Sequence, residues 1–591
     1  MCGIAGYIGY RNAADVCING LKRLEYRGYD SYGIAVVSGA GAAPGTAPGA
    51  LSVFKSAGKI SDAKDLPADF AGSIGISHTR WATHGVPNEI NAHPHLDCAK
   101  KIAVVHNGII ENYAELRRGL EERGHVFLSQ TDTEVIPHLI EEKFNGDLFA
   151  AVQEVLPLLS GSYAILAAAE GVNAVVAARR GSPLVLGIGD NECILASDVV
   201  PLIEYTRKVV YFEDGDAAEI TPRGYKIVNG GAPVERAAAE IGWDADVVRK
   251  GGYPHYMLKE IFEQPDVFSA SLLSVRENGA AVDLMRLAYS ITVVACGTSA
   301  NAAQFFAYLA ESVCKIPVRV VLASEFRYFP TPGLHLVIGV SQSGETADTL
   351  TALKLARELG AKTLAVTNVL GSSITRAADA VIYTRAGPEI SVAATKSFTS
   401  QIAVFMELVN LASGGKLQKA IGDISRYLSS VASVDVAQAA DLCKDAQSLI
   451  YIGRGFSCPM ALEGALKMKE ISYIHAEGYA AGELKHGPFA LLSPEVPVVA
   501  VSFAQDGAYP VMMSNLKEIK AREAPLVVIG TKGDRDAAEV ADVFIGLPDV
   551  SGEAGAVLAI VVMQVLAYEV AVMRGCEVDM PRNLAKSVTV E

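Results

Sequence analysis

The sequence lacks an excess of positive charge, a signal segment and a membrane-spanning run. Its 591 residues carry a formal net charge of -15, which argues against nucleic acid or an anionic membrane as the main partner. No basic stretch precedes an apolar run at the amino terminus, so we predict no secretory signal. The longest apolar run, residues 557–573, contains Gln564 and Glu569 and is more typical of a core helix than of a membrane span.

Cysteine pairs and cofactor motifs are also missing. The chain has nine cysteines, an odd number, and none in Cys-x-x-Cys spacing, which favours a reduced, cytoplasmic protein over a disulfide scaffold. No flavin, nucleotide or metal motif is present, so we expect no cofactor. His84, His93 and His95 lie close in sequence, but no cysteine or carboxylate arrangement completes a metal site around them, and we expect no metal.

The first residues contain a candidate nucleophile. Removal of Met1 would leave a thiol and a free α-amine on Cys2. That amine titrates at about 7.7–8.0 in model peptides, so it can take the thiol proton and activate the sulfur. Gly3, Ile4 and Ile8 suit a buried strand. An ordinary first strand with an inert Cys2 explains these residues equally well, and the downstream motifs decide between the two interpretations.

Three clusters downstream supply the groups that an acyl transfer at Cys2 would need. Asn107 and the N–H of Gly108 can form an oxyanion hole, although Asn-Gly is also a common turn. Arg80 can bind a carboxylate and Asp132 an ammonium group, but surface charge or helix capping would explain either residue. The clusters are residues 78–85 (HTRWATHG), 105–109 (VHNGI) and 129–134 (SQTDTE).

These motifs resemble those of class II glutamine amidotransferase domains. The resemblance rests on CGI at residues 2–4, RGYDS at 27–31, HTRWATHG at 78–85, NAHPH at 91–95, HNGIIEN at 106–112 and TDTEV at 131–135. It implies an α/β fold for residues 2–240, the four-layer αββα arrangement of N-terminal-nucleophile enzymes. It also implies that Cys2 attacks the side-chain amide of glutamine, which releases ammonia and leaves a thioester for water to hydrolyse.

The same resemblance implies roles for the neighbouring residues. Asn107 and Gly108 form the oxyanion hole, and Arg80 and Asp132 hold the α-carboxylate and α-amine of glutamine. Two further residues match family positions: Trp81, which gates the ammonia channel, and His93, in a loop of the glutamine pocket. A core aromatic residue would also explain Trp81.

The second half follows a different pattern. After a predicted linker at residues 241–260, strands, loops and helices alternate from about residue 290, which indicates parallel sheets. Residues 290–299 (SITVVACGTS) recur in similar form as residues 448–457 (SLIYIGRGFS). We therefore predict two doubly wound parallel-sheet domains in tandem. Their expected boundaries are 261–430 and 431–575, followed by a tail at 576–591.

One of the two copies carries a candidate phosphate site. Residues 341–346 (SQSGET) lie between a buried strand and a helix, where hydroxyls, a glycine and helix N–H groups suit a phosphate. Thr298 and Ser299 add hydroxyls at the end of another strand. Ordinary helix capping needs fewer hydroxyls than this. The second copy has FAQDG at residues 503–507, so we predict one phosphate site per chain.

The second copy carries candidate catalytic residues. Glu463, Lys467 and Glu470 lie at i, i+4 and i+7 on one face of a predicted helix, although a solvent-facing stripe of ion pairs has the same spacing. His486 lies in a loop and suits proton transfer. Lys586 lies in a terminal segment with few other charges; a buried lysine there can lose its proton and act as an amine nucleophile.

This half resembles paired sugar isomerase domains. The resemblance rests on ACGTS at residues 295–299, SQSGETADTL at 341–350, residues 463–488 (EGALKMKEISYIHAEGYAAGELKHGP) and PRNLAKSVTVE at 581–591. Together with the glutaminase motifs, it makes the whole chain similar to amidotransferases that convert glutamine and fructose 6-phosphate into glutamate and glucosamine 6-phosphate. By this resemblance the sugar-phosphate ligands are Thr298, Ser299, Ser341, Gln342, Ser343, Thr346, Val392 and Ala585.

The resemblance also implies a division of catalytic work. Lys586 would form a Schiff base at the ketose carbonyl, while Glu470 moves the proton between C1 and C2 with help from Lys467. His486 would open the sugar ring, contributed by the neighbouring subunit of a homodimer. Two alternatives stay open: an amidotransferase for a different sugar phosphate, and a sugar-phosphate sensor without catalysis. A sensor would have no use for Cys2, Glu470 and Lys586 together.

Overall fold

The computed structural model describes residues 2–38, 49–60, 66, 70–81, 85–242, 250–329 and 333–589. The chain forms two compact units, one made of residues 1–249 together with 585–591, the other of residues 250–584. Each unit is described by itself. His84, most of the glycine- and alanine-rich segment at 39–50 and residues 243–249 of the predicted linker lie outside the described residues.

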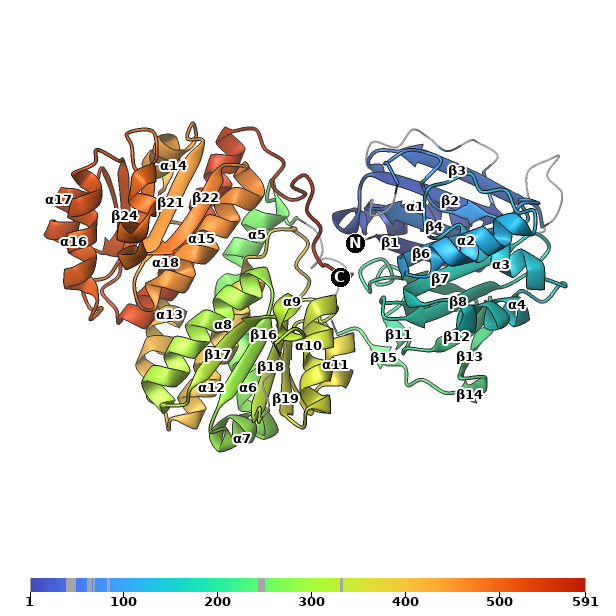
Figure 1. The fold of residues 1–591 in the computed structure, drawn as a ribbon, viewed down its shortest axis with the longest axis horizontal. Helices are drawn as coiled ribbons and strands as arrows, with labels where there is room; N and C mark the ends of the chain where they lie inside the picture. Colours follow the sequence, from blue (N-terminus) through green and yellow to red (C-terminus); the bar gives the residue numbers. More distant parts are fainter. Residues whose placement is uncertain are drawn as a thin grey trace. The chain divides into compact units, whose positions relative to one another are not determined.

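The first unit contains two antiparallel sheets. The eight-stranded sheet has the order β15-β11-β9-β10-β1-β4-β2-β3, and the seven-stranded sheet has the order β14-β13-β12-β8-β7-β6-β5 (Figure 1). The strands are β1 Gly3–Ile8, β2 Ser31–Val37, β3 Leu51–Ala57, β4 Ile74–Arg80, β5 His95–Leu96, β6 Ile102–Ile110, β7 Gly161–Ala169, β8 Val175–Arg180, β9 Val185–Ile188, β10 Cys193–Ala196, β11 Lys208–Tyr211, β12 Asp216–Thr221, β13 Gly224–Asn229, β14 Ala232–Val234 and β15 Ala239–Glu240.

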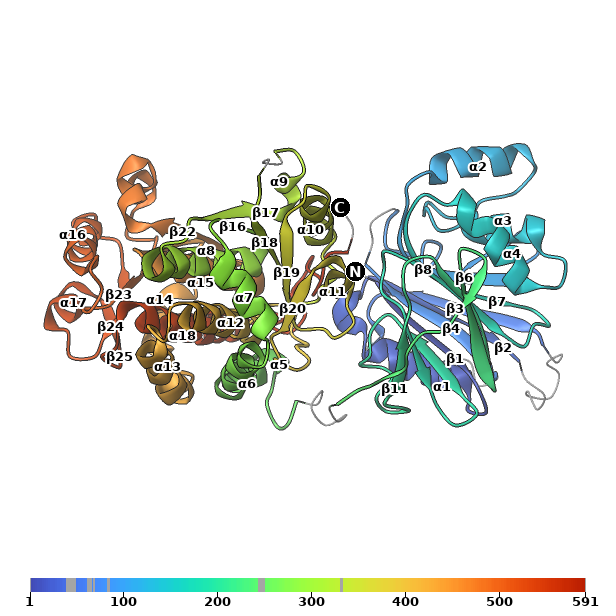
Figure 2. The same cartoon turned by 90° about the horizontal axis from the view of Figure 1, so that it is seen from below.

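Alternating side chains of these strands build three apolar layers. Ile4 and Ile8 of β1 point between the two sheets, whereas Tyr7 points outward toward α1 (Ala13–Lys22), as the two-residue period of a strand requires. The helices α2 (Tyr113–Glu122), α3 (Val135–Lys143) and α4 (Leu148–Val155) cover the outer face of the other sheet (Figure 2). The unit is therefore a four-layer αββα sandwich, which confirms the predicted fold class.

The second unit contains two five-stranded, wholly parallel sheets. Their orders are β17-β16-β18-β19-β20 and β22-β21-β23-β24-β25, so both follow the same order when the strands of each are counted along the chain. The strands are β16 Ile291–Ala295, β17 Val318–Leu322, β18 Leu336–Ser341, β19 Lys362–Thr367, β20 Ala380–Tyr383, β21 Ser448–Gly453, β22 His475–Ala480, β23 Val498–Ser502, β24 Leu526–Thr531 and β25 Val543–Leu547. This topology confirms the predicted pair of doubly wound domains.

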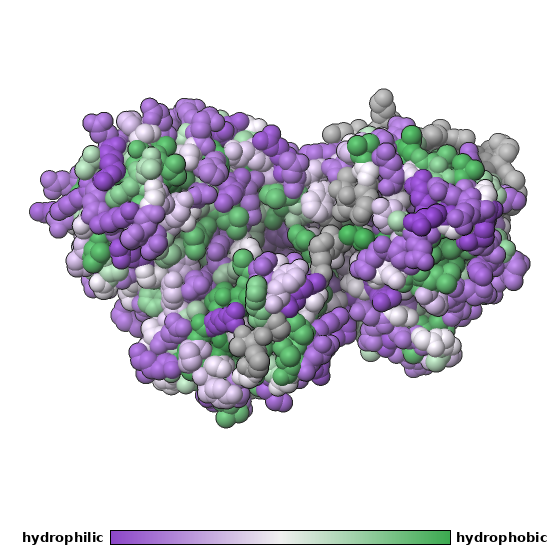
Figure 3. Space-filling view, viewed as in Figure 1, coloured by the Kyte–Doolittle hydropathy of each residue, from purple (hydrophilic) through white to green (hydrophobic). Residues whose placement is uncertain are grey.

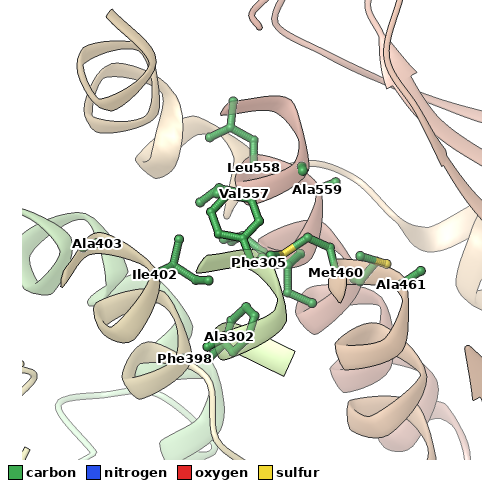
Figure 4. Close-up of a cluster of buried hydrophobic side chains, with 14 of the residues drawn as sticks. Ala302, Phe305, Phe398, Ile402, Ala403, Met460, Ala461, Val557, Leu558 and Ala559 are labelled. Atoms are coloured by element: carbon green, nitrogen blue, oxygen red, sulfur yellow. The ribbon is translucent and has the colours of Figure 1, made fainter. Parts of the chain in front are cut away.

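The two repeats share one apolar core, where α8, α12, α15 and α18 meet. Phe305, Phe398, Ile402 and Met460 come from three of these helices and point toward one another (Figure 4). The helices of this unit are α5 Tyr256–Phe262, α6 Gln264–Arg276, α7 Gly279–Leu287, α8 Gly297–Leu309, α9 Ala323–Phe326, α10 Ala347–Glu358, α11 Ser373–Ala377, α12 Lys396–Ala412, α13 Gln418–Val431, α14 Ala437–Cys443, α15 Ser457–Ser472, α16 Tyr509–Lys520, α17 Arg535–Val540 and α18 Gly552–Met573.

Helix α18 accounts for the longest apolar run. Within the described ranges it is the one helix long and apolar enough to cross a membrane, but 83% of its most apolar window is buried in the unit. It packs along α15, so its apolar residues serve the core, as the sequence predicts. In contrast, mainly polar side chains cover the displayed face of each unit (Figure 3).

Candidate active sites of the two units

Cys2 lies at the start of β1, in the middle of the eight-stranded sheet. The backbone N–H of Trp81 donates a hydrogen bond to Cys2 Sγ at 3.2 Å, and the thiol lies 3.5 Å from the carbonyl oxygen of Trp81. Burial raises the pKa of the Cys2 thiol. The sulfur is therefore protonated at neutral pH and needs a base before it can act as a nucleophile.

Glycine is required next to this cysteine. A Cβ at Gly3 would lie 2.8 Å from Leu24 Cβ and from Thr79 Cγ2. The tight packing fixes the backbone of β1 against β4, the strand that leads to Arg80 and Trp81.

Asn107 and Gly108 lie within strand β6, so the alternative of a plain Asn-Gly turn is wrong. The Asn107 Nδ2 donates to the carbonyl oxygen of Cys2 at 3.0 Å, and its Oδ1 lies 3.0 Å from His78 Nε2. A side-chain amide has two N–H groups, so holding Cys2 occupies only one of them. Gly108 has φ +129°, and a Cβ there would lie 2.0 Å from the carbonyl oxygen of Ser162, a position open only to glycine.

Arg80 and Asp132 are buried, so neither is the surface charge that the sequence left possible. Arg80, 3% exposed at the end of β4, donates to the carbonyl oxygens of Gly85 at 3.2 Å and Val86 at 3.5 Å. Asp132 accepts the Ile110 N–H at 2.8 Å and is not the N-cap of α3, which is Glu134. The first unit thus buries a cationic group at the end of β4, which pairs with β1, and an anionic group beside the end of β6.

His93 belongs to a buried stack of histidines that the sequence did not reveal. Its ring lies 4.1 Å from that of His78 and 4.7 Å from that of His95, centroid to centroid, and its Nδ1 accepts the backbone N–H of His106 at 3.3 Å. Burial lowers the pKa of all four, that of His78 to about 3. These rings are neutral, and His78 supports the side chain of Asn107. The available signal was the density of histidines in the sequence, since five of them, including these four, lie within residues 78–106.

The predicted phosphate site lies at the carboxyl ends of β16 and β18. These two strands are neighbours, and the connections that follow them run to opposite sides of the sheet. Open α/β sheets bind their ligands at such a point, where the strand order reverses. Ser341 Oγ lies 2.8 Å from Thr346 Oγ1 and accepts the Gly344 N–H at 3.0 Å. Gly344 has φ +65°, and a Cβ there would lie 2.1 Å from Ser372 Oγ. The hydroxyls and the amino end of α10 are thus brought together.

Four more of the predicted sugar-phosphate residues make hydrogen bonds of their own in the second unit. Ser343 Oγ accepts the Glu345 N–H at 3.2 Å, and Ser299 Oγ, at the start of α8, accepts from Gln401 Nε2 at 3.0 Å. The carbonyl oxygen of Gln342 accepts the N–H of Asn368 at 3.0 Å. Val392, 8% exposed, donates its N–H to the carbonyl oxygen of Asp579 at 2.9 Å.

The second sheet lacks hydroxyl side chains in the equivalent loop. After β23, Asp506 Oδ1 accepts the N–H of Ala508 at 2.9 Å, and the ring of Phe503 packs against Gly555 of α18. Residues 503–507 carry no hydroxyl side chain, whereas residues 341–346 carry three, so this loop agrees with the expectation of a single phosphate site.

Glu463, Lys467 and Glu470 form a buried ion cluster on α15, so the alternative of a solvent-facing stripe is wrong. Lys467 Nζ lies 3.3 Å from Glu463 Oε1 and 2.6 Å from Glu470 Oε2, and both Glu463 and Lys467 are fully buried. Burial alone would lower the pKa of Lys467, but the two carboxylates raise it above its ordinary value. Burial raises the pKa of Glu463. Lys467 is therefore an ammonium group at neutral pH.

Thr298 links this cluster to the first repeat. Its hydroxyl donates to Glu463 Oε1 at 2.9 Å and receives a hydrogen bond from Lys467 Nζ at 3.1 Å, while Asn301 Nδ2 donates to Glu463 Oε2 at 2.8 Å. The sequence predicts Thr298 only as a sugar-phosphate ligand and gives no signal for Asn301. No spacing rule relates residues 298–301 to residues 463–470, because a tertiary contact joins them.

Three further predicted residues lie near the surface of their units. His486 ends a 3-10 turn at Ala481–His486 and is exposed. Ala585 and Lys586 are half-buried and belong to the terminal segment that packs with the first unit. Their roles at the sugar stay predictions.

Comparison with known proteins decides the family. A glutamine amidotransferase domain model matches residues 78–204, and a SIS domain model matches residues 284–411 and 443–574. Proteins from Thermus thermophilus, Bacteroides thetaiotaomicron and Thermococcus kodakarensis are 44%, 46% and 47% identical to this chain, each covering 100% of both chains. Each is a glutamine–fructose-6-phosphate aminotransferase (isomerizing). The chain belongs to this family.

A solved structure agrees with the family assignment for the second unit. The C-terminal domain of glucosamine-fructose-6-phosphate aminotransferase from Francisella tularensis is 34% identical, with a TM-score of 0.52, and covers 56% of this chain and 100% of that chain. Membership of the aminotransferase family confirms both resemblances that the sequence motifs indicated.

Proposed function

We infer that the protein transfers the amide nitrogen of glutamine to fructose 6-phosphate and isomerises the product to glucosamine 6-phosphate, with glutamate released. The observation that carries this function is the full-length match to relatives of that name. Buried constellations around Cys2 in the first unit and around Lys467 in the second support it.

In the first unit, the chemistry is acyl transfer. We propose that removal of Met1 frees the α-amine of Cys2, which takes the thiol proton that burial holds on the sulfur. The thiolate attacks the side-chain amide of glutamine, the oxyanion is stabilised by Asn107 and Gly108, and ammonia leaves. Water then hydrolyses the thioester to glutamate. Arg80 and Asp132 bind the α-carboxylate and α-amine of the substrate, while roles for Trp81 at the ammonia path and His93 near the glutamine remain part of the proposal.

For the sugar chemistry, the charge of Lys467 supports Lys586 as the lysine that forms the Schiff base. An amine must be neutral to attack a carbonyl, and Lys467 is held as an ammonium by two carboxylates. We assign the Schiff base to Lys586 instead. Lys467 then fixes the carboxylate of Glu470, which moves the proton between C1 and C2 of the sugar. The phosphate is held by the hydroxyls and N–H groups of the loop at residues 341–346.

The assignment to Lys586 has a direct test. Incubation with fructose 6-phosphate and borohydride should reduce the imine and add the sugar phosphate irreversibly to the peptide that contains Lys586. Adduct on Lys467, with none on Lys586, would contradict the assignment. Repeating the assay with other ketose phosphates distinguishes the proposed acceptor from a different sugar phosphate, since only the true acceptor should both label the lysine and yield an amino sugar.

We propose a homodimer in which His486 opens the sugar ring of the neighbouring subunit's substrate. Its exposure on the chain supports a role outside its own subunit. In a mixture of His486→Ala and Glu470→Gln subunits, each mixed dimer has one intact site, so about a quarter of the activity should return. No recovery after exchange of subunits would place His486 in its own subunit's site.

All nine cysteines lie among the described residues and are unpaired, which supports the cytoplasmic location expected from the sequence.

A further inference from the structure

A second cluster of reactive side chains lies in the first unit, away from Cys2. It consists of Cys98, after β5; His125, after α2; and His138 and Glu141, one turn apart on α3. Cys98 Sγ lies 3.5 Å from the Nδ1 atoms of both histidines, and these two Nδ1 atoms lie 3.2 Å apart. Glu141 Oε2 lies 3.2 Å from His125 Nδ1 and 3.5 Å from His138 Nδ1.

These distances are those of a tetrahedron around a metal ion. Each of the four residues offers one ligand atom, and all four atoms lie within 4.8 Å of one another. Five of the six distances between these atoms are 3.2–3.5 Å. A tetrahedron with edges of that length has its centre about 2.0–2.1 Å from each corner, and Zn–N and Zn–O bonds in proteins are about 2.0–2.2 Å long and Zn–S bonds about 2.3 Å. Thiolate and imidazole ligands favour zinc over magnesium or calcium.

A carboxylate on the far side of each histidine ring determines which ring nitrogen carries the proton and which one offers a lone pair to the cluster. His125 Nε2 lies 3.3 Å from Glu142 Oε1, and His138 Nε2 lies 3.9 Å from Glu134 Oε1. A neighbouring carboxylate favours the tautomer with its proton on Nε2, which leaves the lone pair on Nδ1. Both Nδ1 lone pairs then face each other at 3.2 Å, a repulsive arrangement unless a cation lies between them. A proton can bridge one pair of these atoms, whereas a metal ion contacts all four.

We propose that Cys98, His125, His138 and Glu141 bind one zinc ion, with Glu134 and Glu142 orienting the two imidazoles. All four ligands come from the protein, which is the pattern of a structural zinc site. The ion joins the turn after β5, the end of α2 and the middle of α3. It thereby closes the segment from His125 to His138, which carries Asp132, and it fixes the ends of that segment. The site is independent of the function proposed above.

The test is the zinc content of the purified full-length chain. After exposure to zinc sulfate and desalting, the wild type should hold about one zinc per chain by mass spectrometry of the metal. The Cys98→Ser/His125→Gln variant should hold at least tenfold less. Cys314→Ser and His475→Gln, which change a thiol and an imidazole in the second unit, should retain wild-type content. Equal zinc in wild type and the double variant would overturn the proposal.

Absorption spectra of the cobalt-loaded protein provide a second test, which identifies the ligands. With Co²⁺ alone, the wild type should show the visible bands of a tetrahedral site and a near-ultraviolet thiolate-to-cobalt charge-transfer band, and Cys98→Ser should lose the charge-transfer band. Glu142→Gln should weaken zinc binding about 10- to 100-fold, as expected for a residue that orients a ligand. Octahedral cobalt spectra, or a charge-transfer band that persists in Cys98→Ser, would contradict the ligand set.

Discussion

Replacing Lys467 with methionine should destabilise the second unit strongly and in a pH-dependent way. The side chain is fully buried between two carboxylates, at 3.3 Å from Glu463 and 2.6 Å from Glu470. Methionine fills much of the same volume but leaves two acidic groups without their shared cation. Removal of one partner of a buried ion pair costs about 3–5 kcal/mol, so we expect a loss of that size at pH 8.

The sign of the pH dependence follows from Glu463. Burial already raises its pKa in the wild type, and loss of the ammonium raises it further in the Lys467→Met variant. At pH values above the pKa that Glu463 has in the unfolded chain, the folded variant binds more protons than the unfolded one. The stability of the variant therefore falls as pH rises. The deficit relative to wild type should be largest at pH 8 and should shrink as pH is lowered toward 5.

Thermal unfolding followed by circular dichroism measures this deficit. Both tryptophans, Trp81 and Trp243, precede residue 250, so tryptophan fluorescence on the same samples reports the first unit as an internal reference. Lys444→Met, which breaks only an exposed ion pair with Asp441, is the control and should change neither signal. The Lys467→Met variant should keep glutamine hydrolysis but lose amino-sugar formation.

Two results would refute this reasoning. A variant as stable as the Lys444→Met control at pH 8 would show that the cluster on α15 is not a buried ion pair. A deficit that grows as the pH falls would show that Glu463 does not carry the raised pKa. Adding Glu463→Gln to Lys467→Met should restore part of the stability, because it removes the unpaired charge.

Three further predictions concern single features of the two units. The Cβ of a Gly344→Ala variant would lie 2.1 Å from Ser372 Oγ, at φ +65°. The variant should raise the KM for fructose 6-phosphate at least tenfold and leave glutamine hydrolysis unchanged. An unchanged KM would contradict the phosphate site. Asn107→Ala should lower kcat for glutamine hydrolysis by a factor of about 10²–10³, the loss expected when one oxyanion-hole donor is removed. A wild-type kcat would show that Asn107 does not stabilise the oxyanion. Burial lowers the pKa of His78 to about 3, so the folded first unit binds fewer protons than the unfolded chain below about pH 6.5. Its unfolding temperature by tryptophan fluorescence should therefore fall from pH 7 to pH 5, and a flat profile would show that the buried histidines do not titrate on unfolding.

Local patterns in the sequence predict most of the fold. Alternating apolar residues in β1 and the repeated strand–loop–helix segments at 290–299 and 448–457 each indicate their element directly. The doubled strand order of the second unit follows from that repeat. Helix α18 could be recognised as a core helix because Gln564 and Glu569 interrupt its apolar run.

The parts that escaped prediction depend on tertiary contacts. Thr298 reaches Glu463 across 165 residues of sequence, and no local periodicity encodes that contact. Spacing alone could not tell a buried i, i+4, i+7 triad from an exposed one, because both lie on one helix face. Cys98, His125 and His138 lie in three segments that only the folded chain brings together, so short ligand motifs in the sequence do not reveal them.

The central claim is that the amide nitrogen of glutamine reaches fructose 6-phosphate through Cys2. The most direct measurement uses glutamine labelled with ¹⁵N at the side-chain amide, with fructose 6-phosphate and mass analysis of the amino sugar. We expect glucosamine 6-phosphate that carries the label and forms in equal amount to glutamate, with label lost in Cys2→Ala while added ammonium restores unlabelled product. Glutamate formed together with free labelled ammonium and no labelled amino sugar would contradict the account.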